Sequence, residues 1–439
     1  MNINSNDLLI VLSETLDCVE KEVLGVSDHH AKRVAWLSIE MARVAKLDET
    51  EIADIAIAAL LHDNALNAVR HDYENKKLKP GMDGNTHCLY GAKNIEAVFN
   101  NKAIEDYVLY HHERADGSGP FSKVANETPL GAQIVHLADK IDLEFALGNI
   151  DSNKLDDIRQ FVSNSIDTLF SKEVSELFYT VLNHHLVEEL SNQNINELSL
   201  NFTPIPLSAS KPLAELFANI IDYKSPFTKV HSIGLATKVE EMAKYYNYDE
   251  KYITKLYIAG ALHDIGKIFI DNEILEKPGR LNDEEYKHIQ SHAYETYRLL
   301  SKINGLEDIR DWASYHHEKL NGKGYPFGLT AQEMNKEVRL LACLDIYQAL
   351  TEDRPYKRGM SHAKAINILY ELAEKGELDK DITKDIDIVF NDGSSFDTNE
   401  KTALFQCSVC GYIYEGDAVP YDYKCPVCGQ PAHVFTRIQ

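Results

Sequence analysis

The sequence lacks the features of several large protein classes. No apolar run approaches the roughly 20 residues of a membrane-spanning helix, and the acidic N-terminus has no basic region of the kind that opens a signal peptide. Basic residues are outnumbered, with 45 Lys and Arg against 69 Asp and Glu, which gives a formal net charge of −24. We therefore expect a cytoplasmic protein that binds neither membrane nor DNA or RNA. A small anionic ligand remains compatible with this charge, because metal ions and a few basic residues can reverse the field locally.

Cysteine is scarce outside one short region near the C-terminus. Cys18, Cys88 and Cys343 are scattered, and we expect small buried or partly exposed thiols there. The other four cysteines form two C-x2-C pairs with fourteen residues between the pairs. This spacing predicts one tetrahedral metal ion, Fe or Zn, held by four thiolates. The predicted ligands are Cys407, Cys410, Cys425 and Cys428.

Strand-like alternation is also scarce before the C-terminus, and an internal repeat takes its place. His30 and His231 each lie 32 residues before a His-Asp pair, and a lone histidine precedes a double histidine by 24 residues in both copies. A later aspartate in an apolar segment completes each set. The first copy is His30, His62, Asp63, His87, His111, His112 and Asp139; the second is His231, His263, Asp264, His292, His316, His317 and Asp345.

These repeats define the predicted organisation. Helix formers with apolar residues at three- and four-residue intervals dominate up to about residue 385. We predict a mainly α protein in which two tandem helical bundles precede a small β-rich metal domain. The predicted boundaries are 1–205, 206–395 and 402–439, with a polar, Gly/Ser-rich break at 391–401.

The recurring residue types indicate metal chemistry. Imidazole and carboxylate ligands together suit first-row divalent metals such as Fe, Mn, Co, Ni or Zn. Seven ligands exceed the needs of one tetrahedral ion, and an adjacent His-Asp pair lets the carboxylate bridge two ions. Such a dinuclear site lowers the pKa of a bridging water and offsets charge on a phosphoryl group under in-line attack. Lys267, one helical turn after His263, is predicted on the same face, where it could stabilise negative charge or protonate a leaving oxygen.

The second copy resembles the HD-GYP subfamily of HD-domain phosphohydrolases, which are cyclic di-GMP phosphodiesterases. The resemblance covers roughly residues 215–375 and rests on "HDIGK", "HHEKLNGKGYPFG" and "CLDIYQALTEDRPYK". It implies two divalent metals, Fe or Mn, one held by His231, His263, Asp264 and Asp345, and the other by Asp264, His292, His316 and His317.

The same resemblance implies substrate-binding groups. The basic residues that bind phosphate in the family match Arg354 and Lys357, and the signature loop matches Gly324, Tyr325 and Pro326. Asp264 and Lys267 are the predicted catalytic residues. One departure lies after the lone histidine, where the usual "HPxxG" reads "HAYET", with Ala293 and Thr296.

The first copy resembles the same fold less closely. Its seven candidate ligands are present, but Leu66 stands where the second copy has Lys267, and "GKGYP" is reduced to "GSGP". Nothing like "TEDRPYK" follows Asp139. We therefore predict a degenerate HD domain with a regulatory or dimerisation role, and a second metal site there is left open.

The cysteine region resembles the rubredoxin-like domain at the C-terminus of rubrerythrins, through "CGYIYEGD", "CPVCG" and Phe435. That resemblance favours one redox-active iron, with structural zinc as the alternative. A module of this size has too little core to fold without metal.

The sequence therefore predicts a metal-dependent phosphodiesterase that hydrolyses cyclic di-GMP to pGpG and onward to GMP, with hydroxide at a dinuclear site as nucleophile. Redox control by the rubredoxin-like domain, a redox partner protein and a homodimer are compatible with this organisation. Two alternatives remain open. One is an HD-type di-iron oxygenase that receives electrons from the rubredoxin-like domain, and the other is a non-enzymatic redox or nucleotide sensor.

Overall fold

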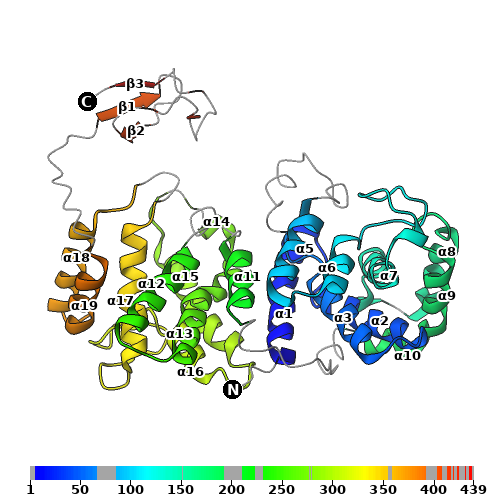
Figure 1. The fold of residues 1–439 in the computed structure, drawn as a ribbon, viewed down its shortest axis with the longest axis horizontal. Coiled ribbons are helices and arrows are strands. Elements are labelled where there is room, and N and C mark those ends of the chain that lie inside the picture. Colours follow the sequence, from blue (N-terminus) through cyan, green and yellow to red (C-terminus); the bar gives the residue numbers. More distant parts are fainter. Residues whose placement is uncertain are drawn as a thin grey trace. The chain divides into compact units, whose positions relative to one another are not determined.

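The computed structural model divides the chain into two compact units, Met1–Phe390 and Asn391–Gln439. Figure 1 shows the fold of the described residues. In the first unit these are 5–66, 86–150, 152–191, 210–222, 231–275, 277, 279–353 and 358–390. In the second unit they are 391, 403–407, 413–416, 419, 423–424, 431 and 435–437.

The first half of the larger unit is built from helices, as predicted. They are α1 (Ser5–Leu24), α2 (His30–Val44), α3 (Glu49–Leu61), α5 (Thr86–Phe99), α6 (Lys102–Leu109), α7 (Leu130–Phe145), α8 (Leu155–Asn164), α9 (Lys172–Val181) and α10 (His184–Glu189), with short 3-10 turns η1 (Ala125–Glu127), η2 (Leu147–Asn149) and η3 (Ser152–Lys154).

The second half repeats this plan. Its elements are α11 (Ser210–Asp222), α12 (His231–Tyr245), α13 (Glu250–Leu262), η6 (Ile265–Phe269), α14 (Asn272–Leu275), α15 (Asp283–Leu300), α16 (Glu307–Ser314), α17 (Lys336–Thr351), α18 (His362–Glu374) and α19 (Lys380–Phe390). Among the helices described in either half, none is long and apolar enough to cross a membrane.

Local sequence signals explain where the key helices begin and end. Asp48 caps α3 by accepting from two backbone N–H groups and is matched by Glu51 in a capping box, while Asp249 caps α13. Both helices end just before the His-Asp pair, so that His62 and His263 are the C-terminal cap residues. The chain turns sharply at each pair, and this turn directs both side chains into the bundle.

Helix packing brings the repeated elements together in the same way in each half. Helix α2 packs on α3 and α7, and α12 packs on α13 and α17. One continuous apolar core of buried residues runs through both halves, from Leu8 to Ile386. Burial of that surface is the main stabilising term for the bundles.

The halves contact each other through α1 and through α5. Helix α1 packs on α2 and α3 of its own half and also contacts η6 of the second half, while α5 contacts α11. Polar contacts reinforce the junction. Lys302 forms an ion pair with Glu14, and Asn304 donates its backbone and side-chain N–H groups to Asp7 at 3.0 and 2.8 Å.

The smaller unit contains a three-stranded antiparallel sheet, in agreement with the predicted β-rich module. Strands β1 (Ala403–Cys407), β2 (Ile413–Gly416) and β3 (Phe435–Arg437) are ordered β2-β1-β3. Phe435 is buried, and Phe405, Tyr414, Val419 and Tyr423 pack against it. Among the described residues of this unit the cluster is small, and the dependence of the module on metal stays a prediction.

Candidate functional site

The histidines of the second half are held in one tautomer. His263 follows α13, His292 lies in α15 and His316 lies two residues after α16. Each ring donates from Nδ1 to the carbonyl oxygen three residues earlier, so that Nε2 carries the lone pair and faces the site. The accepting carbonyls are those of Gly260 at 2.7 Å, Ile289 at 2.5 Å and Ala313 at 2.6 Å.

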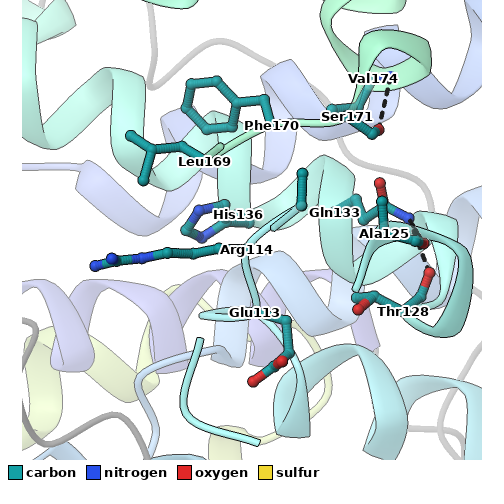
Figure 2. A pocket seen from close by; sticks show the side chains of 11 residues that line it. Glu113, Arg114, Ala125, Thr128, Gln133, His136, Leu169, Phe170, Ser171 and Val174 are labelled. Carbon is teal, nitrogen blue, oxygen red and sulfur yellow. Dashed lines mark hydrogen bonds between the residues drawn. The ribbon is translucent and has the colours of Figure 1, made fainter. Parts of the chain in front are cut away.

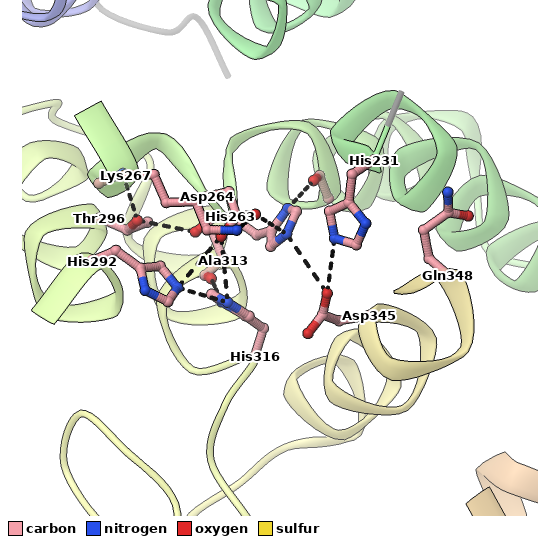
Figure 3. A network of polar contacts seen from close by, with 12 residues as sticks. His231, His263, Asp264, Lys267, His292, Thr296, Ala313, His316, Asp345 and Gln348 are labelled. Carbon is pink, nitrogen blue, oxygen red and sulfur yellow. Dashed lines mark hydrogen bonds and ion pairs between the residues drawn. The ribbon is translucent and has the colours of Figure 1, made fainter. Parts of the chain in front are cut away.

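Two aspartates lie among these nitrogens (Figure 3). Asp264 has His263 Nε2 3.1 Å from its Oδ2, and His292 Nε2 3.4 Å from its Oδ1. Its two oxygens therefore face opposite groups of histidines, as a bridging carboxylate requires. Asp345 Oδ1 lies 3.0 Å from His231 Nε2, and its Oδ2 lies 3.7 Å from His317 Nδ1.

The arrangement fits two divalent ions. The potential ligand atoms form two groups, His231 with His263 and Asp264, and His292 with His316 and His317, and within each group they lie within 4.8 Å of one another. Among the residues that the structure describes, His263 Nε2 and Asp264 Oδ1 are buried without a hydrogen-bond partner. The Nε2 atoms of His292 and His316 are 3.4 Å apart. Because both Nε2 atoms carry lone pairs, a shared cation satisfies them better than a hydrogen bond can.

Electrostatics at the second ligand group and at Asp264 agree with this interpretation. At His231 burial would lower the pKa, but the hydrogen bonds with Asp345 and Glu352 outweigh burial and raise it to about 10. Burial, with a contribution from His317, lowers the pKa of His292 to about 3, and burial lowers that of His317 to about 4. These rings are neutral at physiological pH and can bind metal. Burial alone would raise the pKa of Asp264, but His263 and Lys267 outweigh it and hold that pKa well below its usual range. The carboxylate is therefore ionised.

Lys267 reaches the site by a different backbone path from the predicted one. The α-helix ends at Leu262, and Lys267 lies in the 3-10 turn η6 rather than one α-helical turn after His263. Its amine still approaches the site, with Nζ 2.5 Å from Asp264 Oδ2 and one fifth of the side chain exposed. The prediction of a helical face was wrong, while the proximity to the site holds.

The signature loop packs against the second histidine group. The Tyr325 ring lies 4.7 Å from the His317 ring, centroid to centroid, and its backbone N–H donates to the His317 carbonyl oxygen. A Cβ on Gly324 would stand 2.4 Å from the Glu318 Cα, so only glycine fits there. Glu318 accepts backbone N–H groups of the loop beyond the cis Tyr325–Pro326 peptide bond. Arg354 and Lys357 lie outside the described residues.

A second layer behind His231 was not predicted from the sequence. Glu352 accepts from His231 Nδ1 at 2.9 Å and is itself held by Gln348, which in turn accepts from Lys238. Such a carboxylate fixes the ring orientation and makes the opposite nitrogen a better ligand. The sequence did contain a signal for this residue. Glu352 lies seven residues after Asp345, close to two helical turns, which places both carboxylates on the same side of the helix.

The seven predicted residues of the first half also come together. The Nε2 atoms of His87 and His111 are 3.4 Å apart, the same separation as in the second half. Asp63 Oδ1 lies 3.4 Å from His87 Nε2, and Asp139 Oδ1 lies 3.3 Å from His30 Nε2. His112 joins the group that contains His87 and His111. Repeat spacing favoured His30 over its neighbour His29, and the structure places His30 with His62 and Asp139, whereas His29 Nδ1 lies 3.8 Å from Asp17.

The surroundings of the first-half site differ from those of the second. His30 Nδ1 pairs with Asp142 at 2.7 Å, and Arg33 binds both oxygens of Asp142, at 2.7 and 2.9 Å. Leu66 is buried where the second half has its lysine. Glu20 of α1, which the sequence did not point to, is fully buried beside His62 and Asp63.

A small pocket adjoins the first-half site (Figure 2). Arg114, Gln133, His136 and Phe170 are among its lining residues. Gln133 is already bonded to the carbonyl oxygens of Ala125 and Thr128. His136 donates from Nδ1 to the His111 carbonyl oxygen, and burial lowers its pKa to about 4. Through His136 the pocket adjoins the first-half histidines, and all of its lining residues belong to the first half.

The cysteine site is described only in part. Cys407 is the last residue of β1. Cys410, Cys425 and Cys428 lie outside the described residues, so four-thiolate coordination stays a prediction.

These geometries agree with the families that the chain matches. The HD domain family matches residues 28–144 and again residues 215–382, and the rubredoxin-like domain family of rubrerythrin matches residues 405–436. The chain therefore carries two HD domains followed by a rubredoxin-like domain, as the sequence predicted. HD domains bind divalent metals, which agrees with the donor sets described above in the two halves, and rubredoxin-like domains bind iron.

Relatives of this chain are cyclic dinucleotide phosphodiesterases of the HD-GYP type. The 3′3′-cGAMP-specific phosphodiesterase 1 of Vibrio cholerae is 28% identical over 397 residues, which cover 87% of this chain and 90% of the relative. A cyclic di-GMP phosphodiesterase of Pseudomonas aeruginosa is 34% identical over 148 residues, covering 33% and 35%. A cyclic GMP-AMP-specific phosphodiesterase structure from V. cholerae shares the fold, with a TM-score of 0.61, 22% identity and coverage of 89% and 98%.

Proposed function

We propose that the second half hydrolyses a 3′,3′-cyclic dinucleotide. The observation that carries the proposal is the pair of three-ligand groups joined by Asp264, with the Lys267 amine beside the joining carboxylate. Two bound divalent ions would supply an acidified water and neutralise charge on the phosphoryl group. The fixed tautomers of His263, His292 and His316 keep their Nε2 lone pairs directed at the site.

Lys267 supplies the part of the chemistry that the histidines cannot. Its amine is partly exposed and lies at the edge of the buried cluster, where a phosphodiester oxygen would approach. From there it can stabilise the developing negative charge or donate a proton to the leaving oxygen. Tyr325 packs on the His317 ring and forms one wall beside the second ligand group.

Two substrates are candidates. The sequence predicts cyclic di-GMP, and the P. aeruginosa relative bears that activity in its name. Two relatives named for 3′3′-cGAMP match most of this chain, including both HD domains. The second of them is 27% identical, and the match covers 83% of this chain and 90% of the relative. This breadth favours 3′3′-cGAMP as the preferred substrate, with cyclic di-GMP as the second candidate.

The test is a substrate panel with the metal-loaded full chain. Purified anaerobically and supplied with Mn²⁺ or Fe²⁺, it is incubated with 3′3′-cGAMP, cyclic di-GMP and cyclic di-AMP, and the products are resolved by chromatography. We expect linear dinucleotide from 3′3′-cGAMP first, and no product from an Asp264→Ala variant. Oxygen consumption without cleavage of any nucleotide would favour the oxygenase alternative and overturn the proposal.

We further propose that the rubredoxin-like domain adjusts activity through the oxidation state of the metals. The match to a rubredoxin-like family supports a one-electron iron centre on the same chain. The reduced protein is expected to be the more active form. Comparison of the full chain with a chain ending near Asn391, each oxidised and then given an electron donor, tests this idea. Equal recovery of hydrolysis, or zinc at the four cysteines, would contradict it.

A further inference from the structure

The first-half site contains a carboxylate that has no counterpart among the described residues of the second half. Glu20 belongs to α1, outside the repeated set of ligands, and its side chain is fully buried. A potential ligand oxygen of Glu20 lies within 4.8 Å of those of His62 and Asp63. In the described part of the chain, neither Glu20 oxygen has a hydrogen-bond partner.

A buried carboxyl group without donors is costly, whichever its protonation state. Three carboxylates, Asp17, Asp63 and Asp139, act on Glu20 with the same sign of charge, and His30 is the main opposing group. A protonated Glu20 would still need an acceptor for its hydrogen, and none is placed for it. A divalent cation at this point would satisfy the oxygens and offset the surrounding negative charge.

Glu20 of the first half can be compared with Lys267, the proposed catalytic lysine of the second half. Ten residues before His231, as Glu20 is ten before His30, stands buried Ile221. Beside its joining aspartate the second half has the Lys267 amine, whereas the first half has Leu66 and the Glu20 carboxylate. One half thus adds a positive charge next to the metal-binding groups, and the other adds a negative charge.

We propose that Glu20 is a metal ligand, and that the first half is a carboxylate-enriched divalent-cation site that retains its ion instead of turning over a phosphodiester. Oxygen ligands added to imidazoles favour ions such as Mn²⁺ and Fe²⁺. The extra negative charge strengthens cation binding and disfavours an anionic substrate. Helix α1 also contacts η6, so this proposed ligand lies on a helix that touches both halves.

The experiment compares Glu20→Gln with Glu22→Gln in the full chain. Glu22 is an exposed residue of the same helix, so the control carries the same chemical change away from the site. Melting temperatures are measured after chelation and after addition of Mn²⁺. We expect Glu20→Gln to lose at least half of the Mn²⁺-induced shift while the chelated protein melts as high as the wild type or higher. Glu22→Gln should behave as the wild type.

Counting of bound Mn²⁺ provides a readout independent of stability. Loss of the six-line electron paramagnetic resonance signal of free Mn²⁺ gives the number of ions bound per chain. The proposal expects about one ion fewer in Glu20→Gln than in Glu22→Gln. An unchanged ion count together with an unchanged Mn²⁺-induced shift would overturn it.

If Glu20→Gln fails to fold, Glu20→Asp is titrated in its place. The shorter side chain withdraws the oxygens by about one C–C bond length while keeping the charge. A Mn²⁺ affinity at least about fivefold weaker than that of Glu22→Asp supports coordination. Equal affinities would identify Glu20 as a buried structural residue.

Discussion

The two HD domains hold the same histidines and aspartates in the same relation, yet their surroundings differ in charge. The Nε2–Nε2 separation of the inner histidine pair is 3.4 Å in both. Behind the first histidine, the first half uses Asp142 bound by Arg33, whereas the second uses Glu352 held through Gln348. At the joining aspartate, one half has a lysine and the other a glutamate. We therefore propose that the same arrangement of ligand residues serves different tasks in the two halves, and that the neighbouring charges decide which task each half performs.

The largest expected effect separates the halves directly. Asp264→Ala removes the carboxylate that faces both ligand groups, and we expect hydrolysis to fall by more than about 10³-fold. Asp63→Ala, the matching change in the first half, should leave the chemical step nearly intact and alter stability or regulation. Single-turnover rates and metal content of both variants provide the measurement. Equal loss of activity in two folded proteins would break the comparison.

Lys267→Met tests the charge difference at the joining aspartate. The variant should keep its metal but lose about 10²-fold in kcat, because one group that stabilises negative charge in the transition state is gone. Leu66→Met in the first half serves as the control and should change neither quantity. Full activity in Lys267→Met would show that Lys267 only forms an ion pair with Asp264 and takes no part in the chemical step.

Glu352→Gln tests the layer behind His231. Loss of the charged acceptor should weaken metal binding by about 10- to 100-fold, and excess Mn²⁺ should restore the rate. Glu374→Gln, at an exposed glutamate of α18, is the matched control. The dependence of rate on Mn²⁺ concentration distinguishes the two. A lowered rate that excess metal cannot restore would point to a structural fault.

The smallest expected effect concerns the hydrogen bonds that fix the His-Asp turn of the second half. Thr296 accepts from the Gly266 N–H and donates to the His263 carbonyl oxygen, both at 3.0 Å. Thr296→Val leaves these buried groups unpaired and should cost about 1–3 kcal/mol in the free energy of unfolding. Thr296→Ser keeps the hydroxyl and should retain most of the wild-type free energy of unfolding. Urea unfolding measures the difference, and no loss in Thr296→Val would show that another group takes over the two bonds.

The sequence predicted the parts of the site that recur and missed those that do not. Spacing alone located both sets of ligands, because a repeated register preserves which side chains meet. Glu20 was missed because α1 reaches the site only through tertiary packing, which no local spacing encodes. Glu352 stands directly before "DRPYK" in the sequence, but its role as the acceptor for His231 Nδ1 depends on the orientation of the His231 ring. The end of α13 at Leu262, which moved Lys267 into a 3-10 turn, was likewise not readable from apolar periodicity.

Helix α1 has contacts with both HD domains, and these contacts should hold the domains together. Its early residues Asp7 and Glu14 bind Asn304 and Lys302 of the second half, and its later part packs on α2 and α3. Cutting the backbone between the halves should therefore leave two fragments that stay together as one particle. Chains expressed separately, one ending near residue 200 and one beginning there, should reassemble when mixed. Helix α1 is then one of the elements that hold the two HD domains together.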